Sequence, residues 1–197
     1  MIFRFQNALD MSLPFDLATP FIPGWGWIYI GSFAFWIYLY TTVAQDSPEA
    51  AYKLSIADCV GKLISLVFFL ALPTTNVRPE VEGSSLTALL MRIIYAMDTP
   101  TNLFPSIHCF IVWLGTRYIF SCKNLKRKSL HCFISLCGTL LVFASTLFTK
   151  QHVVLDVFGG IAAAEIGWLI ATFSPLSNIL QKWNERFMKT KLCNQYL

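Results

Sequence analysis

The sequence predicts an all-α integral membrane protein, a bundle of about five transmembrane helices with interfacial segments at its N- and C-terminal ends. Of the 197 residues, 55% are hydrophobic and only 13% are charged, and the mean hydropathy is +0.56. An ordinary soluble domain carries about 25% charged residues, so that class is excluded. Long apolar stretches recur along the chain, and its basic residues gather in two places. We expect a single membrane domain over residues 1–197, with its core at 25–173.

Five apolar stretches approach the length of about 20 residues that a helix needs to cross a bilayer. They are residues 25–44, 54–72, 105–121, 130–149 and 153–173. The N-terminal stretch "MIFRFQNALDMSLPF" is too short and too charged to be a sixth span, and it alternates apolar and polar residues as interfacial segments do. The C-terminal tail, 176–197, is predicted to be amphipathic in the same way.

Lys and Arg residues predict which side of the membrane each loop faces, because they are enriched in cytoplasmic loops. They concentrate in "KNLKRK" (123–128) and in the tail, at Lys182, Arg186, Lys189 and Lys191. Both segments are therefore predicted to be cytoplasmic, and the loop 73–104 and the turn 149–152 then face the other side. Anionic lipids at the cytoplasmic surface account for these basic runs, so no nucleic-acid partner is expected.

Several charged residues fall inside the apolar stretches. Asp58 and Lys62 are four residues apart in the second span and are expected to form a structural ion pair. Glu165, in the last span, is predicted either to be a buried carboxyl bonded to another span or to make a polar contact near the cytoplasmic end. Arg117 is expected to extend toward the headgroups. The six cysteines show no paired spacing, so neither disulfides nor a metal site are predicted.

The side chains best suited to chemistry lie on the predicted non-cytoplasmic side. His152 and Asp156 are four residues apart, a spacing that places both on one face of a helix, where a carboxylate can fix the tautomer of an imidazole. This is the arrangement of a catalytic dyad. An isolated pair of this spacing is also typical of a capping aspartate beside an interfacial histidine, so neighbouring residues must decide.

Those neighbours suit a phosphate group. Pro105 and Ser106 commonly begin a helix, and the N–H groups of a helix start attract anions. His108 falls in the first turn, where it could donate a proton to a leaving oxygen. Arg78, in the loop after the second span, offers a planar guanidinium that suits phosphate, although an anchor at the headgroup level is an equal interpretation.

Three stretches carry these residues: "RPE" at 78–80, "FPSIH" at 104–108 and "STLFTKQHVVLD" at 145–156. In order and in spacing they resemble the three signature motifs of the type 2 phosphatidic acid phosphatase superfamily. The resemblance covers about residues 70–165. It implies a membrane enzyme that acts on a lipid-linked phosphate without a metal or other cofactor.

The resemblance also implies roles for individual residues. His152 would take the phosphoryl group as phosphohistidine, Asp156 would orient His152, and His108 would protonate the leaving alkoxide. The phosphate oxygens would be held by Arg78, Ser106 and Ser145.

The chain departs from the family pattern at three positions. Ala71 stands where the family has a lysine, Thr146 where it has an arginine, and Ile107 where it has a glycine. Two phosphate-binding cations are thus missing, and charge on a transferring phosphoryl group needs stabilising donors. Lys150 and Arg92 are the candidates to replace them. The variant motifs are more similar to the inositol phosphotransferase branch, which includes inositol phosphorylceramide synthase-like proteins.

Three functions therefore stay open from the sequence. The first is hydrolysis of a lipid phosphate or diphosphate at the non-cytoplasmic face, the second is transfer of a phosphate-bearing headgroup to a lipid acceptor, and the third is lipid binding without catalysis. The absence of long loops favours a bacterial inner-membrane protein. The sequence does not predict which lipid is used or the oligomeric state.

Overall fold

The computed structural model describes residues 8–176, 178–183 and 186, and this part of the chain is mostly helical. Its helices are α1 (Pro14–Ala18), the 3-10 helix η1 (Pro23–Trp25), α2 (Gly26–Ala44), α3 (Pro48–Ala71), α4 (Leu86–Met97), α5 (Ile107–Ser121), α6 (Lys128–Phe148) and α7 (Val154–Phe173). One pair of two-residue strands, β1 (Leu9–Asp10) and β2 (Thr74–Thr75), runs parallel, with Leu9 opposite Thr74. The predicted all-α class is confirmed.

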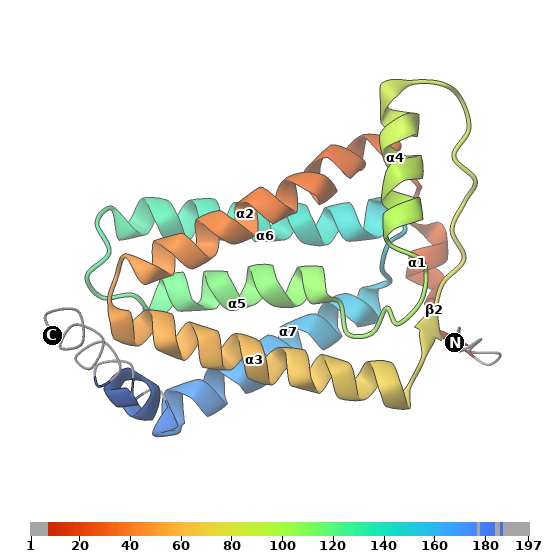
Figure 1. Ribbon diagram of the computed structural model, residues 1–197. Helices are drawn as coiled ribbons and strands as arrows, with labels where there is room; N and C mark the ends of the chain where they lie inside the picture. The colour runs from red at the N-terminus through yellow and green to blue at the C-terminus, as the bar shows by residue number, and fades with distance from the viewer. Residues whose placement is uncertain (1–7, 177, 184–185, 187–197) are drawn as a thin grey trace, which may run out of the picture.

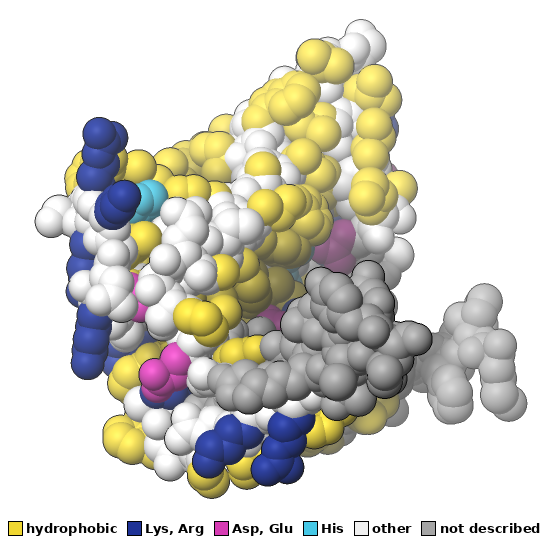
Figure 2. Space-filling view, turned by 60° about the vertical axis from the view of Figure 1, so that its left-hand side comes forward, with side chains coloured by type: hydrophobic (Ala, Val, Ile, Leu, Met, Phe, Trp, Pro, Cys, Tyr) yellow, Lys and Arg dark blue, Asp and Glu magenta, His cyan; other side chains and the backbone are white. Residues whose placement is uncertain are grey.

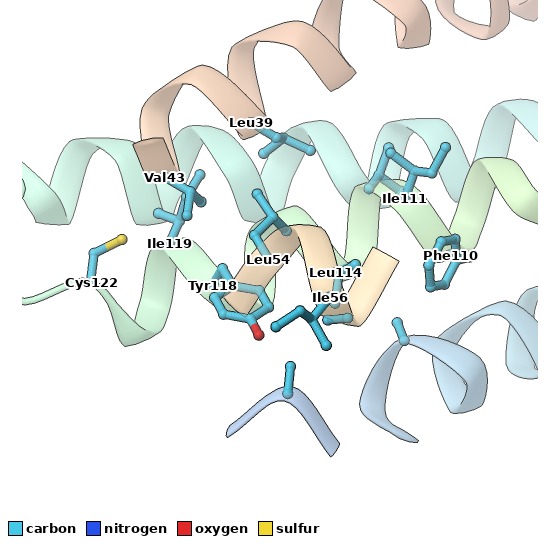
Figure 3. Close-up of a cluster of buried hydrophobic side chains, with 14 of the residues drawn as sticks. Leu39, Val43, Leu54, Ile56, Phe110, Ile111, Leu114, Tyr118, Ile119 and Cys122 are labelled. Carbon is cyan, nitrogen blue, oxygen red and sulfur yellow. The ribbon is translucent and has the colours of Figure 1, made fainter. Parts of the chain in front are cut away.

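Helix α5 lies at the centre of the bundle. It packs against α2, α3, α6 and α7, and α3 and α7 pack against each other. Figure 1 shows these five helices running lengthwise, while α4 stands across one end of the bundle, near α1 and β2. The buried side chains between them include Leu39 from α2 and Phe110, Leu114 and Ile119 from α5 (Figure 3).

Among the described residues, four helical segments are long and apolar enough to cross a membrane: Pro23–Ala44, Pro48–Ala71, Lys128–Phe148 and Val154–Phe173. They make the protein membrane-embedded. The predicted third span, 105–121, differs, because α5 has only 15 residues. At about 1.5 Å per residue it is about 22 Å long, less than the hydrocarbon core of about 30 Å. The helix ends at Ser121, as predicted, but begins two residues later than predicted, because Ser106 caps its start.

The charged residues inside the bundle are paired. Lys62 Nζ lies 2.6 Å from Asp58 Oδ2, as predicted, and the Tyr40 hydroxyl donates to the other oxygen of Asp58 at 2.8 Å. Glu165 accepts a hydrogen bond of 2.8 Å from Trp113 Nε1 of α5, so its carboxyl does bond to another helix. Arg117 lies 3.5 Å from Glu165 and stacks over the Trp168 ring at 3.6 Å, instead of only extending toward headgroups.

Basic residues occupy one end of the bundle. The "KNLKRK" loop joins α5 to α6, at the opposite end of α5 from His108 (Figure 1). Figure 2 turns this end toward the viewer and shows Lys and Arg side chains along its margin. The predicted amphipathic tail is described only in part, and residues 187–197, with Lys189 and Lys191, lie outside the described residues.

Candidate active site

The site forms at the end of the bundle opposite the basic loop. Three connecting segments meet there: 72–85, 98–106 and 149–153. Thr74 joins the first two, because its Oγ1 accepts the backbone N–H groups of Leu103 and Phe104 at 2.8 and 2.9 Å. Asn76 joins the first to the third by donating to the Lys150 carbonyl at 2.9 Å. The three motif stretches, far apart in the sequence, are thereby brought together.

The first element of the site is the His152–Asp156 pair. Asp156 is the third residue of α7, and its Oδ2 accepts both from the Val153 N–H at 3.0 Å and from Nδ1 of His152 at 3.2 Å. Both side chains are buried, and a proton on Nδ1 leaves the Nε2 lone pair available. The contact agrees with the prediction, but its cause does not. His152 lies in the loop before α7, so the pair meets through helix capping and not on one helical face.

The backbone before α7 holds His152 in place. The Thr146 carbonyl, near the end of α6, accepts the N–H groups of Gln151 and His152 at 3.0 and 3.1 Å. On the far side, the Ser106 N–H donates to the Asp156 carbonyl at 3.0 Å, which fixes the start of α5 against the start of α7. Thr146 stands where the resembled motif has an arginine, and its backbone carbonyl helps to orient His152.

The second element is His108, in the first turn of α5. Its ring centroid lies 6.0 Å from that of His152, and aromatic rings of α2 surround it. Its Nδ1 lies 3.5 Å from the Tyr29 hydroxyl. Its Nε2 is buried and, among the described residues, has no hydrogen-bond partner. Such a nitrogen is suited to meet an incoming ligand.

The third element is Arg78, which reaches both histidine-bearing segments. One guanidinium nitrogen, Nη1, donates to the Asp98 backbone carbonyl, and Nη2 donates to Gln151 Oε1 at 2.6 Å. The guanidinium also lies over the Tyr95 ring, 5.0 Å from its centroid. Burial lowers the pKa of Arg78, and the nearby Asp98 carboxylate opposes that shift. The Arg78 guanidinium is therefore held against Gln151, the residue that precedes His152.

Lys150 lies in the same cavity as His152. This cavity of about 320 Å³ is also lined by Asp16, Asn76 and Val153. The residue adopts a left-handed conformation, with φ of 54°, and its Nζ donates to the Asp16 carbonyl at 2.6 Å. Burial lowers the pKa of Lys150. Of the two candidates to replace the missing cations, this is the one that the structure places beside a site histidine.

The remaining predicted phosphate ligands have other hydrogen bonds. Ser106 is fully buried, and its Oγ accepts from the Cys109 N–H at 3.3 Å as the cap of α5. Ser145 is also fully buried, and its hydroxyl donates to the Val142 carbonyl at 2.7 Å. Arg92 is exposed on α4 and donates to the carbonyls of Val81 and Gly83, both at 3.0 Å. The hydrogen bonds described for Arg92 thus hold the loop before α4 and reach neither histidine.

Sequence reasoning missed several residues that the structure brings to the site: Asp16, Tyr29, Asp98 and Gln151. Asp16 is buried and caps α7, because its Oδ1 accepts the Val154 N–H at 2.8 Å. The Tyr29 hydroxyl donates to Asp98 Oδ2 at 2.6 Å. Asp98 lies close before "FPSIH" and Gln151 directly before His152, so proximity to a motif was the available signal. Nothing in the sequence indicates the roles of Asp16 and Tyr29.

The two histidines line different cavities. His152 lines the cavity that it shares with Lys150. His108 lines a second cavity of about 270 Å³ between α2 and α4, which is largely apolar except for Asp98 and Tyr29. Its other lining residues are Ile30, Phe33, Ile94 and Met97. A ligand with a polar group and an apolar chain would suit this arrangement.

The comparisons with known proteins give no relative for this chain. No family model, no curated protein and no solved structure matches it. The described residues also contain no group of three or more His, Cys, Asp or Glu side chains that could hold a metal ion. The function is therefore inferred from the site itself.

Proposed function

We propose that this membrane-embedded protein is a lipid phosphatase, which removes phosphate from a lipid phosphate or diphosphate through a phosphohistidine intermediate. The observation that carries the proposal is the pairing of His152 with the buried Asp156, beside the His108 ring at 6.0 Å. A nucleophile, its orienting carboxylate and a proton donor are the groups that this reaction needs. The resemblance of the three motifs to the type 2 phosphatidic acid phosphatase superfamily supports the same reaction.

The reaction then runs in two displacements. Nε2 of His152 attacks phosphorus, the P–O bond to the lipid breaks, and His108 gives its proton to the leaving alkoxide. In the second step His108 takes a proton from water, the water oxygen attacks phosphorus, and the P–N bond to His152 breaks. Asp156 favours the positive charge that develops on His152, while Arg78 and Lys150 offset the charge on the phosphoryl oxygens.

The arrangement of the ends supports a site on the non-cytoplasmic face. The basic loop 123–128 follows the C-terminal end of α5, whereas His108 lies in its first turn. Because basic loops favour the cytoplasm, the histidines belong to the opposite surface. We propose the inner membrane of a bacterium as the location.

Transfer to a lipid acceptor is a second candidate, favoured by the cavity at His108. In-line chemistry brings the second nucleophile to phosphorus from the side that the leaving alcohol occupied. An apolar cavity at that side suits a lipid alcohol as well as water. The motif variants, similar to the inositol phosphotransferase branch, agree with this alternative.

Phosphate release from a panel of lipid phosphates and diphosphates, by the purified protein in detergent without added metal, tests the proposal. We expect release by the wild type that is lost in His152→Ala. The matched control is His131→Ala, since His131 binds the Tyr38 hydroxyl at 2.8 Å in the basic half of the molecule. Release by His152→Ala equal to wild type would exclude the phosphohistidine.

The other functions have their own outcomes in this assay. Phosphate transfer that requires an added lipid or polyol acceptor would favour the phosphotransferase. Lipid binding with neither release nor transfer would identify the protein as a non-catalytic lipid-binding protein.

A further inference from the structure

A buried tyrosine stands between His108 and a carboxylate. Tyr29, on α2, is only 2% exposed, and its ring lies against that of His108 at a tilt of 31°, with 4.4 Å between ring centroids. Its hydroxyl donates to Asp98 Oδ2 at 2.6 Å, and its oxygen lies 3.5 Å from Nδ1 of His108. Because the hydroxyl proton is directed to Asp98, the oxygen lone pairs are free to accept a proton from Nδ1.

Among the titratable groups around His108, Asp98 is the carboxylate that hydrogen bonds link to it, through the Tyr29 hydroxyl. The titratable groups facing it are Tyr29 from α2, Asp98 from the end of α4, and His152 from the loop before α7. Arg78, from the loop after α3, bonds the backbone carbonyl of Asp98 and not its carboxylate. The other rings against His108, those of Phe33 and Trp36, do not titrate.

We propose that Asp98 and Tyr29 form a relay that holds His108 with a proton on Nδ1 and offsets part of the cost of charging this buried ring, so that Nε2 carries the proton given to the leaving alkoxide. The catalytic meaning of the relay rests on the proposed function. When the step occurs, the Nε2 proton moves to the alkoxide, Nδ1 keeps its proton, Tyr29 stays protonated and Asp98 stays ionised. Asp98 and Tyr29 are positioning residues that act through His108.

The relay mirrors the arrangement at the other histidine. At His152 a carboxylate contacts Nδ1 directly, which leaves Nε2 as a nucleophile. At His108 the carboxylate acts through a hydroxyl, and the buried Nε2, which has no partner in the described part of the chain, is directed to the reaction. One site thus contains two imidazoles, each oriented at Nδ1 for a different role.

The relay can be tested without turnover, because the chain has only three histidines. Nitrogen NMR of the detergent-solubilised protein, labelled with ¹⁵N-histidine, follows the protonation of each ring. We expect Asp98→Asn to lower the pH at which His108 takes up its second proton by about one unit, since an attractive charge is removed. Tyr29→Phe should change the His108 Nδ1 resonance in the same direction.

Tyr38→Phe and Tyr40→Phe are the matched controls. Both tyrosines lie on α2; one binds His131 at 2.8 Å and the other binds Asp58 at 2.8 Å. We expect Tyr38→Phe to alter only the His131 resonance, which also assigns it, and Tyr40→Phe to alter none. If neither Asp98→Asn nor Tyr29→Phe moves the His108 resonance more than these controls do, the relay is disproved.

Turnover provides the second measurement, through the leaving group. Alkyl alcohols leave slowly without an acid, whereas nitrophenol needs none. We expect Tyr29→Phe and Asp98→Asn to lower release from an alkyl lipid phosphate at least about 10-fold more than from a nitrophenyl phosphate. Equal losses on the two substrates would contradict the relay. A wild type inactive on both would count against the proposed function, and the NMR titration would then decide the relay alone.

Discussion

Asp156 uses one oxygen for two tasks. Its Oδ2 accepts the N–H of Val153, which begins α7, and also orients His152, while its Oδ1 is buried without a partner among the described residues. The same side chain therefore serves the fold and the chemistry. An amide can retain the first task, because its carbonyl oxygen still accepts a backbone N–H, but it lacks the charge that supports a cationic histidine.

Asp156→Asn should separate these two tasks. We expect phosphate release to fall at least about 100-fold, in the way that an orienting aspartate of a catalytic triad behaves. The free energy of unfolding should fall by no more than about 1 kcal/mol, the typical worth of a helix cap. Phosphate release and thermal unfolding in detergent measure the two effects. The control is Asp58→Asn, on α3, which breaks the ion pair between Asp58 and Lys62 and should leave phosphate release unchanged.

Arg78 and Arg92 allow a paired comparison of two arginines near the same end of the chain's bundle. Arg78 bridges the Asp98 carbonyl and Gln151, a geometry that requires two nitrogens of one plane. Arg78→Lys should lower release about 10-fold or more, because lysine offers one point charge in place of that fork. Arg92→Lys should not change release, since Arg92 binds only loop carbonyls among the described residues. Equal losses in initial-rate assays would contradict this assignment.

At the scale of whole helices, apolar length predicted most of the bundle. It missed the boundaries that polar residues set. Helix α3 begins at Pro48, six residues before the predicted start, because Ser47 caps it by accepting the Ala50 N–H at 3.1 Å. Helix α5 is shorter than predicted, and the helices around it cover its apolar residues, so it need not match the bilayer.

The site was predictable where chemistry follows local spacing and not where it follows tertiary contact. The spacing of four residues indicated His152 with Asp156, and the motif order brought Arg78 and His108 to the same place. The Tyr29–Asp98 bond joins residues 69 apart, and the Asp16–Val154 bond joins residues 138 apart. Such contacts depend on how helices rotate and pack, which no single-sequence pattern contains.

Gly160 lets α7 approach the start of α5 closely. A Cβ built there would lie 2.6 Å from the Ser106 carbonyl oxygen and 2.9 Å from the Phe110 nitrogen, both backbone atoms that cannot move aside alone. Gly160→Ala should therefore push α7 from α5 and separate His152 from His108. We expect a stability loss of about 1–3 kcal/mol and a larger fractional loss of turnover.

Gly31→Ala is the matched control for this substitution. Gly31 also lies within a helix, α2, and a Cβ there would meet nothing within 4 Å. We expect its unfolding temperature to be unchanged or slightly raised, because alanine favours helices. Thermal unfolding and phosphate release on the same samples make the comparison. If both variants behave alike, the close approach at Gly160 does not matter for the site.

The molecule as a whole has two chemically different ends. The site, with its two histidines, its carboxylates and Arg78, is at the end where α4 crosses the bundle, and the basic loop 123–128 is at the other (Figure 1). Four membrane-length helices separate them. A lipid phosphate reaching the site from the bilayer would then present its headgroup at one surface only.

The difference between the site end and the basic end predicts which membrane surface each end faces. Glu82, in the loop before α4, and Lys126, in the basic loop, are both exposed, so a cysteine at either position is accessible from water. In sealed right-side-out vesicles, a membrane-impermeant maleimide should label Glu82→Cys and not Lys126→Cys, relative to the parent chain. Inverted vesicles should show the reverse, and permeabilised membranes should label both. Labelling of the two positions from the same side would contradict the two-ended arrangement. Labelling of Glu82→Cys only in inverted vesicles would place the site on the cytoplasmic side. That result would overturn the orientation inferred from the basic residues.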